Sequence, residues 1–247
     1  MGISDPLTLA LLDEVRLRKL YQKILRTERA SLISYLPLRE TSGAVAYDLS
    51  GNGYNGASVN VTLGGAGIGD GWPSYGFDGA SAYVNWYSAA LAAAFNGAEG
   101  TLLAWGRMPA AAWIDGLNHW LVGLWVDANN RIDLRKATTD NTLQATYIAG
   151  GTIKLVTSVA LGGLLTSFCM GMTWKTASDA FAFYLSGVQS GATRTGLGVW
   201  AGTLAATGTV IGAQTTTPTT PWLGNGAHVA LWSKALTPAQ VAYVSKV

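Results

Sequence analysis

The sequence is poor in charge. Only 12% of its 247 residues are Asp, Glu, Lys or Arg, about half of the roughly 25% that is usual in a soluble domain. With 49% hydrophobic and 10% aromatic residues, this composition excludes an intrinsically disordered chain and predicts an ample core. The net charge of +2 leaves no strongly basic surface, so we expect no nucleic acid partner.

Cysteine and histidine are also scarce. A single cysteine, Cys169, excludes an internal disulfide, and the two histidines, His119 and His228, do not build a Cys/His metal site with it on sequence grounds. Cys169 lies in the run 167–174, where every second residue from Phe168 onward is apolar and marks one strand face. We therefore expect Cys169 to be a small packed residue on the opposite face.

Long apolar runs are missing as well. No stretch reaches the roughly 20 uninterrupted apolar residues of a transmembrane helix, so membrane insertion is not expected. The apolar run 7–12 follows Asp5-Pro6 and leads into Asp13-Glu14, without the basic leader and cleavage pattern of a signal peptide. Synthesis and assembly in the cytoplasm are the corresponding expectation.

The few charges are unevenly placed. Ten of them, including the whole excess of +2, lie in residues 1–30, whereas Tyr21 is the only aromatic residue there. Most glycines and all other aromatic residues follow Ala30. We predict a boundary at this point, between an N-terminal segment of residues 1–30 and a second domain of residues 31–247.

The N-terminal segment predicts a helix. Asp5 can cap it, Pro6 suits the first helical position, and residues 7–29 are mostly good helix formers. Apolar residues cover several of its faces, so they need burial. The helix either packs on its own domain or is buried against other subunits in an assembly, for example a trimer. The expected contact residues are Leu7, Leu11, Leu17, Tyr21 and Ile24.

From residue 31 the pattern is that of β-structure. Short runs rich in aromatic and β-branched residues are separated by Gly, Asn and Asp turns, which predicts an antiparallel sandwich or barrel. The predicted strands are 31–36, 83–86, 102–107, 119–126, 131–136, 143–148, 167–174, 180–185, 209–213 and 227–233. Near the end, Thr237-Pro-Ala-Gln240 has the pattern of a capped helix start.

Several segments of the β part occur in a characteristic order: 35–43, 48–56, 75–79 with 83–84, 104–107, 171–174, 183–187, 211–212 and 226–241. Over residues 31–247 this ordered set resembles the laminin G-like domains of the concanavalin A-like lectin/glucanase superfamily. The resemblance implies a jelly-roll sandwich of two antiparallel sheets, with the first and last strands adjacent and the helix at Thr237 closing the end. The predicted N-terminal helix lies outside the family's pattern.

The same superfamily contains glycosidases, which carry their acidic residues at alternating positions of one strand. The ten acidic residues of the β part include no pair two positions apart, so we expect no enzyme. A glycosidase whose acids come from distant segments is kept as an alternative.

Calcium is the metal that the resemblance suggests. Asp48 matches a position that can contribute to a calcium site, but relatives often carry acidic residues where this chain has Ala227 and His228. We therefore expect no metal or other cofactor, with structural calcium at Asp48 as the weaker alternative. The favoured interpretation is that Asp48 binds the backbone of its own turn.

Glycan binding needs an aromatic ring and a few polar groups. Of the ten tryptophans, Trp105, Trp174 and Trp232 match apolar family positions and are expected to be buried. Candidates for exposure are Trp72, Trp113 and Trp200; the best site combines Trp113 with Asp115 and Asn118 in one loop. The alternatives for Trp113 are that it plugs the rim of the sandwich or meets a neighbouring subunit.

These observations favour a non-enzymatic structural protein of a bacterial virus particle, on its tail, fibre or capsid. The sandwich would face outward and bind cell-surface glycan, while the N-terminal segment would contact other copies or other virion proteins. The alternative is a secreted or cell-surface carbohydrate-binding module of a bacterium. The nearly neutral surface suits neutral ligands or assembly contacts.

Overall fold

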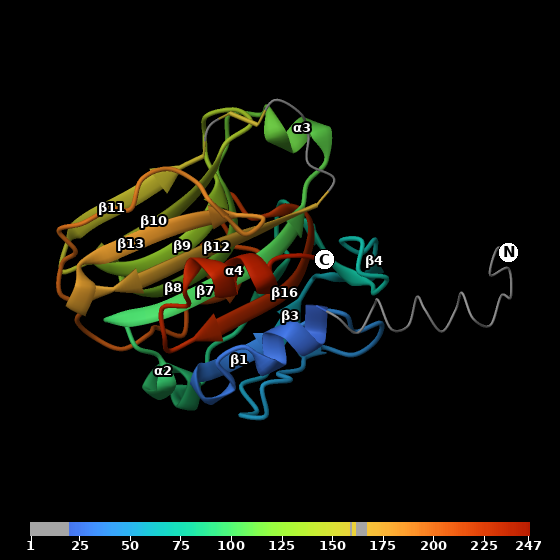
Figure 1. The fold of residues 1–247 in the computed structure, drawn as a ribbon. Coiled ribbons are helices and arrows are strands. Elements are labelled where there is room, and N and C mark those ends of the chain that lie inside the picture. Colours follow the sequence, from blue (N-terminus) through green and yellow to red (C-terminus); the bar gives the residue numbers. More distant parts are fainter. Residues whose placement is uncertain (1–19, 159, 162–166) are drawn as a thin grey trace, which may run out of the picture.

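The computed structural model describes residues 20–158, 160–161 and 167–247. Within them the chain forms two antiparallel sheets packed face to face (Figure 1). Sheet I has the strand order β14-β13-β12-β7-β16-β5-β4, with β1 also paired to β16. Sheet II has the order β11-β10-β9-β8-β15-β6-β3-β2. The predicted all-β sandwich is confirmed.

The strands of sheet I are β1 (Leu32–Leu36), β4 (Thr62–Gly65), β5 (Ser74–Asp78), β7 (Glu99–Arg107), β12 (Phe168–Lys175), β13 (Ala180–Leu185), β14 (Val188–Gln189) and β16 (Leu223–Trp232). Those of sheet II are β2 (Val45–Ala46), β3 (Gly56–Val59), β6 (Tyr83–Asn85), β8 (His119–Asp127), β9 (Asn130–Lys136), β10 (Leu143–Ala149), β11 (Thr152–Thr157) and β15 (Thr209–Ile211). The helices are α2 (Ala89–Ala94), α3 (Ala110–Trp113), α4 (Pro238–Val244) and the 3-10 turns η1 (Arg29–Ser31) and η2 (Thr176–Ser178). Residues 20–26 are also helical. Each of the ten predicted strands corresponds to one of these elements.

The inner core lies between the two sheets. Strand β12 shows how alternation builds it, since Phe168, Met170, Met172 and Trp174 all point into this core. Cys169 points to the other face of sheet I and is buried there, as predicted. Burial raises the pKa of the Cys169 thiol to about 12, so the thiolate that a nucleophile needs does not form near neutral pH.

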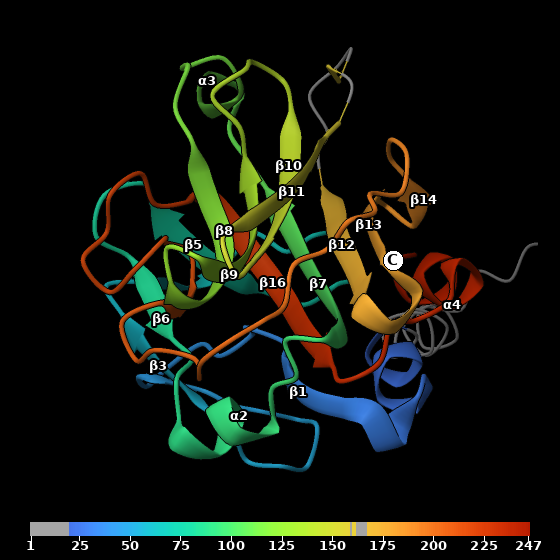
Figure 2. The same ribbon diagram turned by 90° about the vertical axis from the view of Figure 1, so that its left-hand side faces the viewer.

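A second core, which we call the outer core, covers part of the opposite face of sheet I. Trp105 of β7 and Trp232 of β16 lie in it and contact a layer formed by helix 20–26 and α4. These two helices lie side by side in both views (Figures 1 and 2), and Lys23 Nζ donates to the Lys246 carbonyl oxygen over 2.9 Å. Strand β7 is therefore buried on both faces.

The outer core buries part of the apolar surface of the N-terminal segment. Ile24 is fully buried against the sandwich, and Tyr21 is half-buried with its ring 6.0 Å from that of Tyr35. The prediction that Ile24 faces other subunits is corrected, because its side chain is buried in its own domain. Tyr21 packs there with part of its surface, and its contact with other subunits stays a prediction. Burying a side chain such as Ile24 stabilises by roughly 1.5–3 kcal/mol. The other expected contact residues, Leu7, Leu11 and Leu17, lie outside the described residues.

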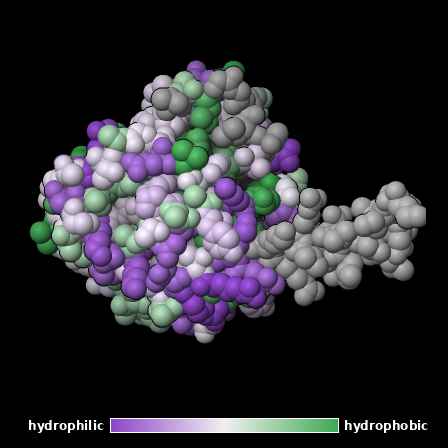
Figure 3. All heavy atoms as spheres, in the orientation of Figure 1, coloured by the Kyte–Doolittle hydropathy of each residue, from purple (hydrophilic) through white to green (hydrophobic). Residues whose placement is uncertain are grey.

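The first and last elements of the sandwich lie where the family resemblance predicts. Strands β1 and β16 are adjacent, with Leu32 opposite Trp232. Helix α4 begins with a capping box in which the Thr237 side chain and the Gln240 side chain each bind the other's backbone N–H. Within the described residues, no helix has the length and apolar character that spanning a membrane requires. The face shown in Figure 3 is mostly hydrophilic or neutral, with hydrophobic residues in small groups.

Candidate functional site

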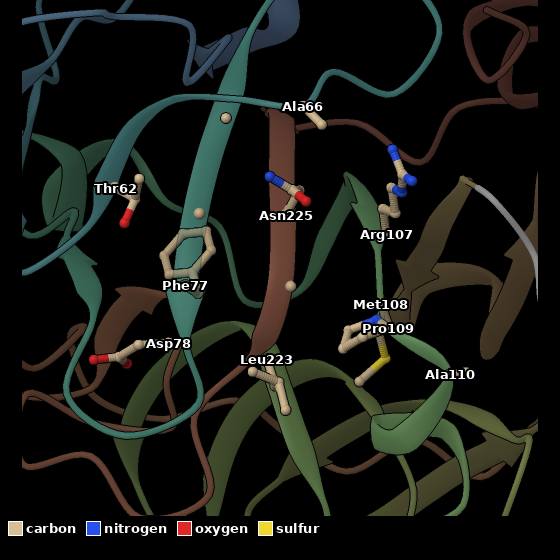
Figure 4. Close-up of a pocket in the computed structure, with 13 residues that line it drawn as sticks. Thr62, Ala66, Phe77, Asp78, Arg107, Met108, Pro109, Ala110, Leu223 and Asn225 are labelled. Carbon is tan, nitrogen blue, oxygen red and sulfur yellow. The ribbon is translucent and has the colours of Figure 1, made fainter.

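A groove of about 630 Å³ lies on the outer face of sheet I, beyond the end of the outer core (Figure 4). The alternation along β7 explains its position, because Leu103 and Trp105 enter the outer core while Arg107, two residues later, is exposed. The groove crosses β4, β5 and β16 to reach the end of β7.

One cross-strand row forms the centre of the groove. Thr62 of β4 lies opposite Gly76 of β5, Gly76 lies opposite Asn225 of β16, and Asn225 lies opposite Arg107 of β7. Directly opposite residues of antiparallel strands project from the same face. The row therefore presents a hydroxyl, a gap, an amide and a guanidinium in that order.

Glycines keep this surface concave. A Cβ atom at Gly76 would lie 3.2 Å from the Thr62 Cβ and would fill the gap in the row. Gly224 has φ +133°, and a Cβ there would lie 2.1 Å from the backbone oxygen of Arg107, which excludes any larger residue.

The polar side chains of the row are not used internally. Within the described part of the chain, the side chains of Thr62, Asn225 and Arg107 have no hydrogen-bond or ion-pair partner. By contrast, Asp78 at the groove's edge accepts from the N–H groups of Ala80, Ser81 and Ala82 at 2.8–2.9 Å. Burial raises the pKa of Asp78, but these hydrogen bonds outweigh it and lower the pKa to about 2.

A second hollow of about 550 Å³ adjoins the groove. The two share Ala66 and Arg107, and the second is lined by Gly67, Gly69, Gly71, Trp72 and Pro73. The loop that lines it contains Asp70, whose carboxylate points into the protein and lies 2.6 Å from His228 Nε2. Arg107 therefore stands between two hollows.

The loop that carries Trp113 is built differently from the prediction. Trp113 is 1% exposed and packs edge-on against Phe168 at a centroid distance of 5.5 Å, so it cannot offer a face to a sugar. The expected exposure is wrong, and Trp113 plugs the rim of the inner core. Asn118 is half-buried in this loop.

The Asp115 carboxylate is used by hydrogen bonds within the protein. It lies 2.6 Å from His119 Nε2 and accepts from the buried Lys136 Nζ over 2.9 Å. Burial raises the pKa of Asp115, but its hydrogen bonds from His119, the Leu117 N–H and Lys136 lower it to about 2. The predicted combination of Trp113, Asp115 and Asn118 therefore does not form an open glycan site.

The other two tryptophan candidates are half-buried. Trp72 borders the second hollow, and the Arg39 guanidinium lies 3.7 Å above its ring. Trp200 packs edge-on against Phe95 at 5.3 Å and covers the inner core. Only Trp72 is thus brought close to the groove.

Asp48 is occupied by its own loop, as the favoured interpretation predicted. Oδ1 accepts from the N–H groups of Tyr35 and Ser50 at 2.8 and 2.9 Å, and Oδ2 accepts from Ser50 Oγ and the Tyr54 N–H at 2.8 and 2.9 Å. Four hydrogen bonds leave little capacity for a cation. In the described ranges, no three His, Cys, Asp or Glu residues are grouped so that they could hold a metal ion.

The sequence did not predict the row in the groove, because the predicted glycan site relied on exposed tryptophan side chains. One signal was present: Arg107 ends the alternating series Leu103, Trp105, Arg107, and a charged residue there indicates that burial of this face stops. Asn225 gave no comparable signal, because its place opposite Arg107 depends on the register of β16.

Comparisons with known proteins give structural neighbours. The botulinum neurotoxin serotype D binding domain matches with a TM-score of 0.62 and 12% identity, over 88% of this chain and 52% of that chain. The receptor binding domain of botulinum neurotoxin C/D mosaic serotype matches with a TM-score of 0.64 and 14% identity, over 88% and 51%. A Trypanosoma rangeli sialidase matches with a TM-score of 0.64 and 12% identity, over 97% and 39%. The likeness to these structures supports a β-sandwich fold.

No family model matches the sequence, and no curated protein does. The chain spans about half of each toxin chain and 39% of the sialidase chain. At this level of identity the likeness concerns the fold, so function has to be argued from the groove.

Proposed function

We propose that this chain is a non-catalytic glycan-binding module of the laminin G-like type, with its sugar site in the groove. The observation that carries the proposal is the row of Thr62, Asn225 and Arg107, three polar side chains on one concave surface with no internal partners among the described residues. A hydroxyl, an amide and a guanidinium can together donate to and accept from sugar hydroxyls.

The apolar lining supports the same proposal. Pro109 and Leu223 flank the polar row, and sugar rings present apolar C–H faces that pack on such surfaces. The likeness to toxin binding domains agrees with a sandwich used for recognition.

Hydrolysis is not favoured by the chemistry of the groove. Glycosidases place two carboxyl groups across the scissile bond, and Asp78 is the only carboxylate among the groove's lining residues. Its hydrogen bonds keep it ionised, so it cannot act as a general acid near neutral pH. Release of reducing sugar from any bound glycan would overturn the non-catalytic assignment.

Two asparagines allow a matched test. Asn225 lies in the groove, while Asn118 lies in the loop favoured by the sequence, and neither side chain has an internal partner in the described ranges. We expect Asn225→Ala to abolish binding on a glycan array and Asn118→Ala to leave it unchanged, with equal melting temperatures. The reverse pattern would move the site to the loop, and no binding by the wild type would refute glycan recognition.

For context, we propose that the module is carried on a bacterial virus particle, with a secreted or cell-surface bacterial module as the alternative. Residues 20–29 pack on the sandwich, so of the expected contact residues Leu7, Leu11 and Leu17, which lie before Leu20, would make the contact with other copies or virion proteins. Deleting residues 1–19 should keep glycan binding and abolish oligomerisation and particle incorporation. Unchanged assembly would refute the attachment role.

A further inference from the structure

The guanidinium of Arg107 is the one feature of the groove that a neutral sugar does not require. Arg107 is exposed at the end of β7, where it meets both hollows. Among the described residues, the groove lining contains one carboxylate, Asp78, and the loop that lines the second hollow contains another, Asp70.

Neither carboxylate is available to it. Asp78 binds three backbone N–H groups and the Ser81 hydroxyl, and Figure 4 shows it on the other side of Asn225 from Arg107. Asp70 is 6% exposed and points inward to His228. The positive charge of Arg107 is therefore not neutralised by either residue.

The groove consequently has two chemically different ends. At the Asp78 end the negative charge is shared with backbone donors, while at the Arg107 end five guanidinium N–H donors face open space beside a glycine-lined loop. Between them, the Asn225 amide can bind hydroxyls. A planar guanidinium matches the two oxygens of an anionic group through parallel hydrogen bonds.

From this arrangement we infer that the groove selects acidic glycans, with the carboxylate or sulfate of the sugar on Arg107 and neutral hydroxyls toward Asn225 and Thr62. The inference rests on the proposed glycan-binding function and refines it. It departs from the neutral ligand that the overall charge balance predicts, because one unneutralised charge inside a groove matters more than the net charge of the whole surface.

The test compares four forms of the full-length protein by calorimetry: wild type, Arg107→Gln, Arg107→Lys and the exposed control Arg194→Gln. The probes are an oligosaccharide containing a uronic or sialic acid, the same compound with its carboxyl group reduced to an alcohol, and a sulfated oligosaccharide of equal length. Circular dichroism melts show whether the variants are folded.

The wild type should bind the acidic compound at least about tenfold more tightly than its reduced form, because a charge-assisted hydrogen bond is worth that much. Arg107→Gln should remove this preference and leave the affinity for the reduced compound unchanged, while Arg107→Lys should keep part of it. Arg194→Gln should behave as the wild type. The carboxylated and sulfated arms identify which anion fits better, and the preference should fall as salt screens the pair.

Equal affinity of the wild type for acidic and reduced compounds would overturn the inference and leave glycan binding intact. A preference that survives in Arg107→Gln would also overturn it. Failure of every compound to bind would instead refute the proposed function, so the two failures are distinguishable.

Discussion

The imidazole of His228 lies with Nε2 2.6 Å from Oδ2 of Asp70, and both side chains are buried. His228 sits in the bulge of β16 with φ 47°, and its Nδ1 lies 2.7 Å from the hydroxyl of Tyr35. Burial raises the pKa of Tyr35 well above its ordinary value, so the hydroxyl keeps its proton at neutral pH. These bonds join β1, β16 and the loop beside the groove.

Removing either member of the His228–Asp70 pair should destabilise the fold. We expect His228→Asn, which tolerates the left-handed backbone, and Asp70→Asn each to cost roughly 1–3 kcal/mol in the free energy of unfolding. The double variant should cost less than the sum by about 0.5 kcal/mol or more, as coupled residues do. Urea unfolding measures all three. Pairing His228→Asn with the exposed Val199→Ala should give additive costs, and additivity for His228 with Asp70 would contradict the coupling.

Trp232 attaches the helical segment to the sandwich through one hydrogen bond. Its Nε1 donates to the Thr27 carbonyl oxygen over 2.9 Å, whereas the Trp105 Nε1 in the same outer core has no partner among the described residues. Trp232→Phe should therefore be more destabilising than Trp105→Phe by about 1 kcal/mol. Hydrogen exchange at residues 20–29 should quicken more in Trp232→Phe; equal exchange in both variants would contradict this attachment.

His119 connects the Asp115 loop to the segment before β16. Its Nδ1 lies 2.7 Å from the Pro221 carbonyl oxygen and its Nε2 lies 2.6 Å from the Asp115 carboxylate.

Asp115 should make the fold sensitive to acid. Its pKa falls from 3.8 to about 2 on folding, so its contribution is complete above pH 4 and is lost as the pH falls toward 2. Melting temperatures of the wild type and Asp115→Asn should differ at pH 5 and converge near pH 2. A difference that stays constant down to pH 2 would show that packing, and not ionisation, explains the effect.

Local pattern predicted most of the sandwich. Alternation placed Phe168 and Cys169 on opposite faces, and the Thr237-Pro-Ala-Gln240 pattern predicted the start of α4. Strands β2 and β14, with two residues each, are too short to show alternation, so they were missed. Strands β3, β4, β5 and β11 were also not among the predicted strands. The outer core was also missed, because apolar residues on both faces of β7 do not reveal which segment covers the second face.

The candidate site depended on long-range pairing. Trp113 is flanked by alanines and a polar loop, which predicted exposure. Its ring instead packs against Phe168, which belongs to strand β12. The groove needs the registers of four strands to bring Thr62, Gly76, Asn225 and Arg107 into one row. These residues lie far apart in the sequence, so local reasoning could not combine them.

Tyr21 places the start of helix 20–26 beside the proposed binding surface, because its ring lies 5.9 Å from that of Trp72, which borders the second hollow. A pull between a bound ligand and an anchor before Leu20 would therefore act between neighbouring groups. The load path would be short, and most strands of both sheets would lie outside it.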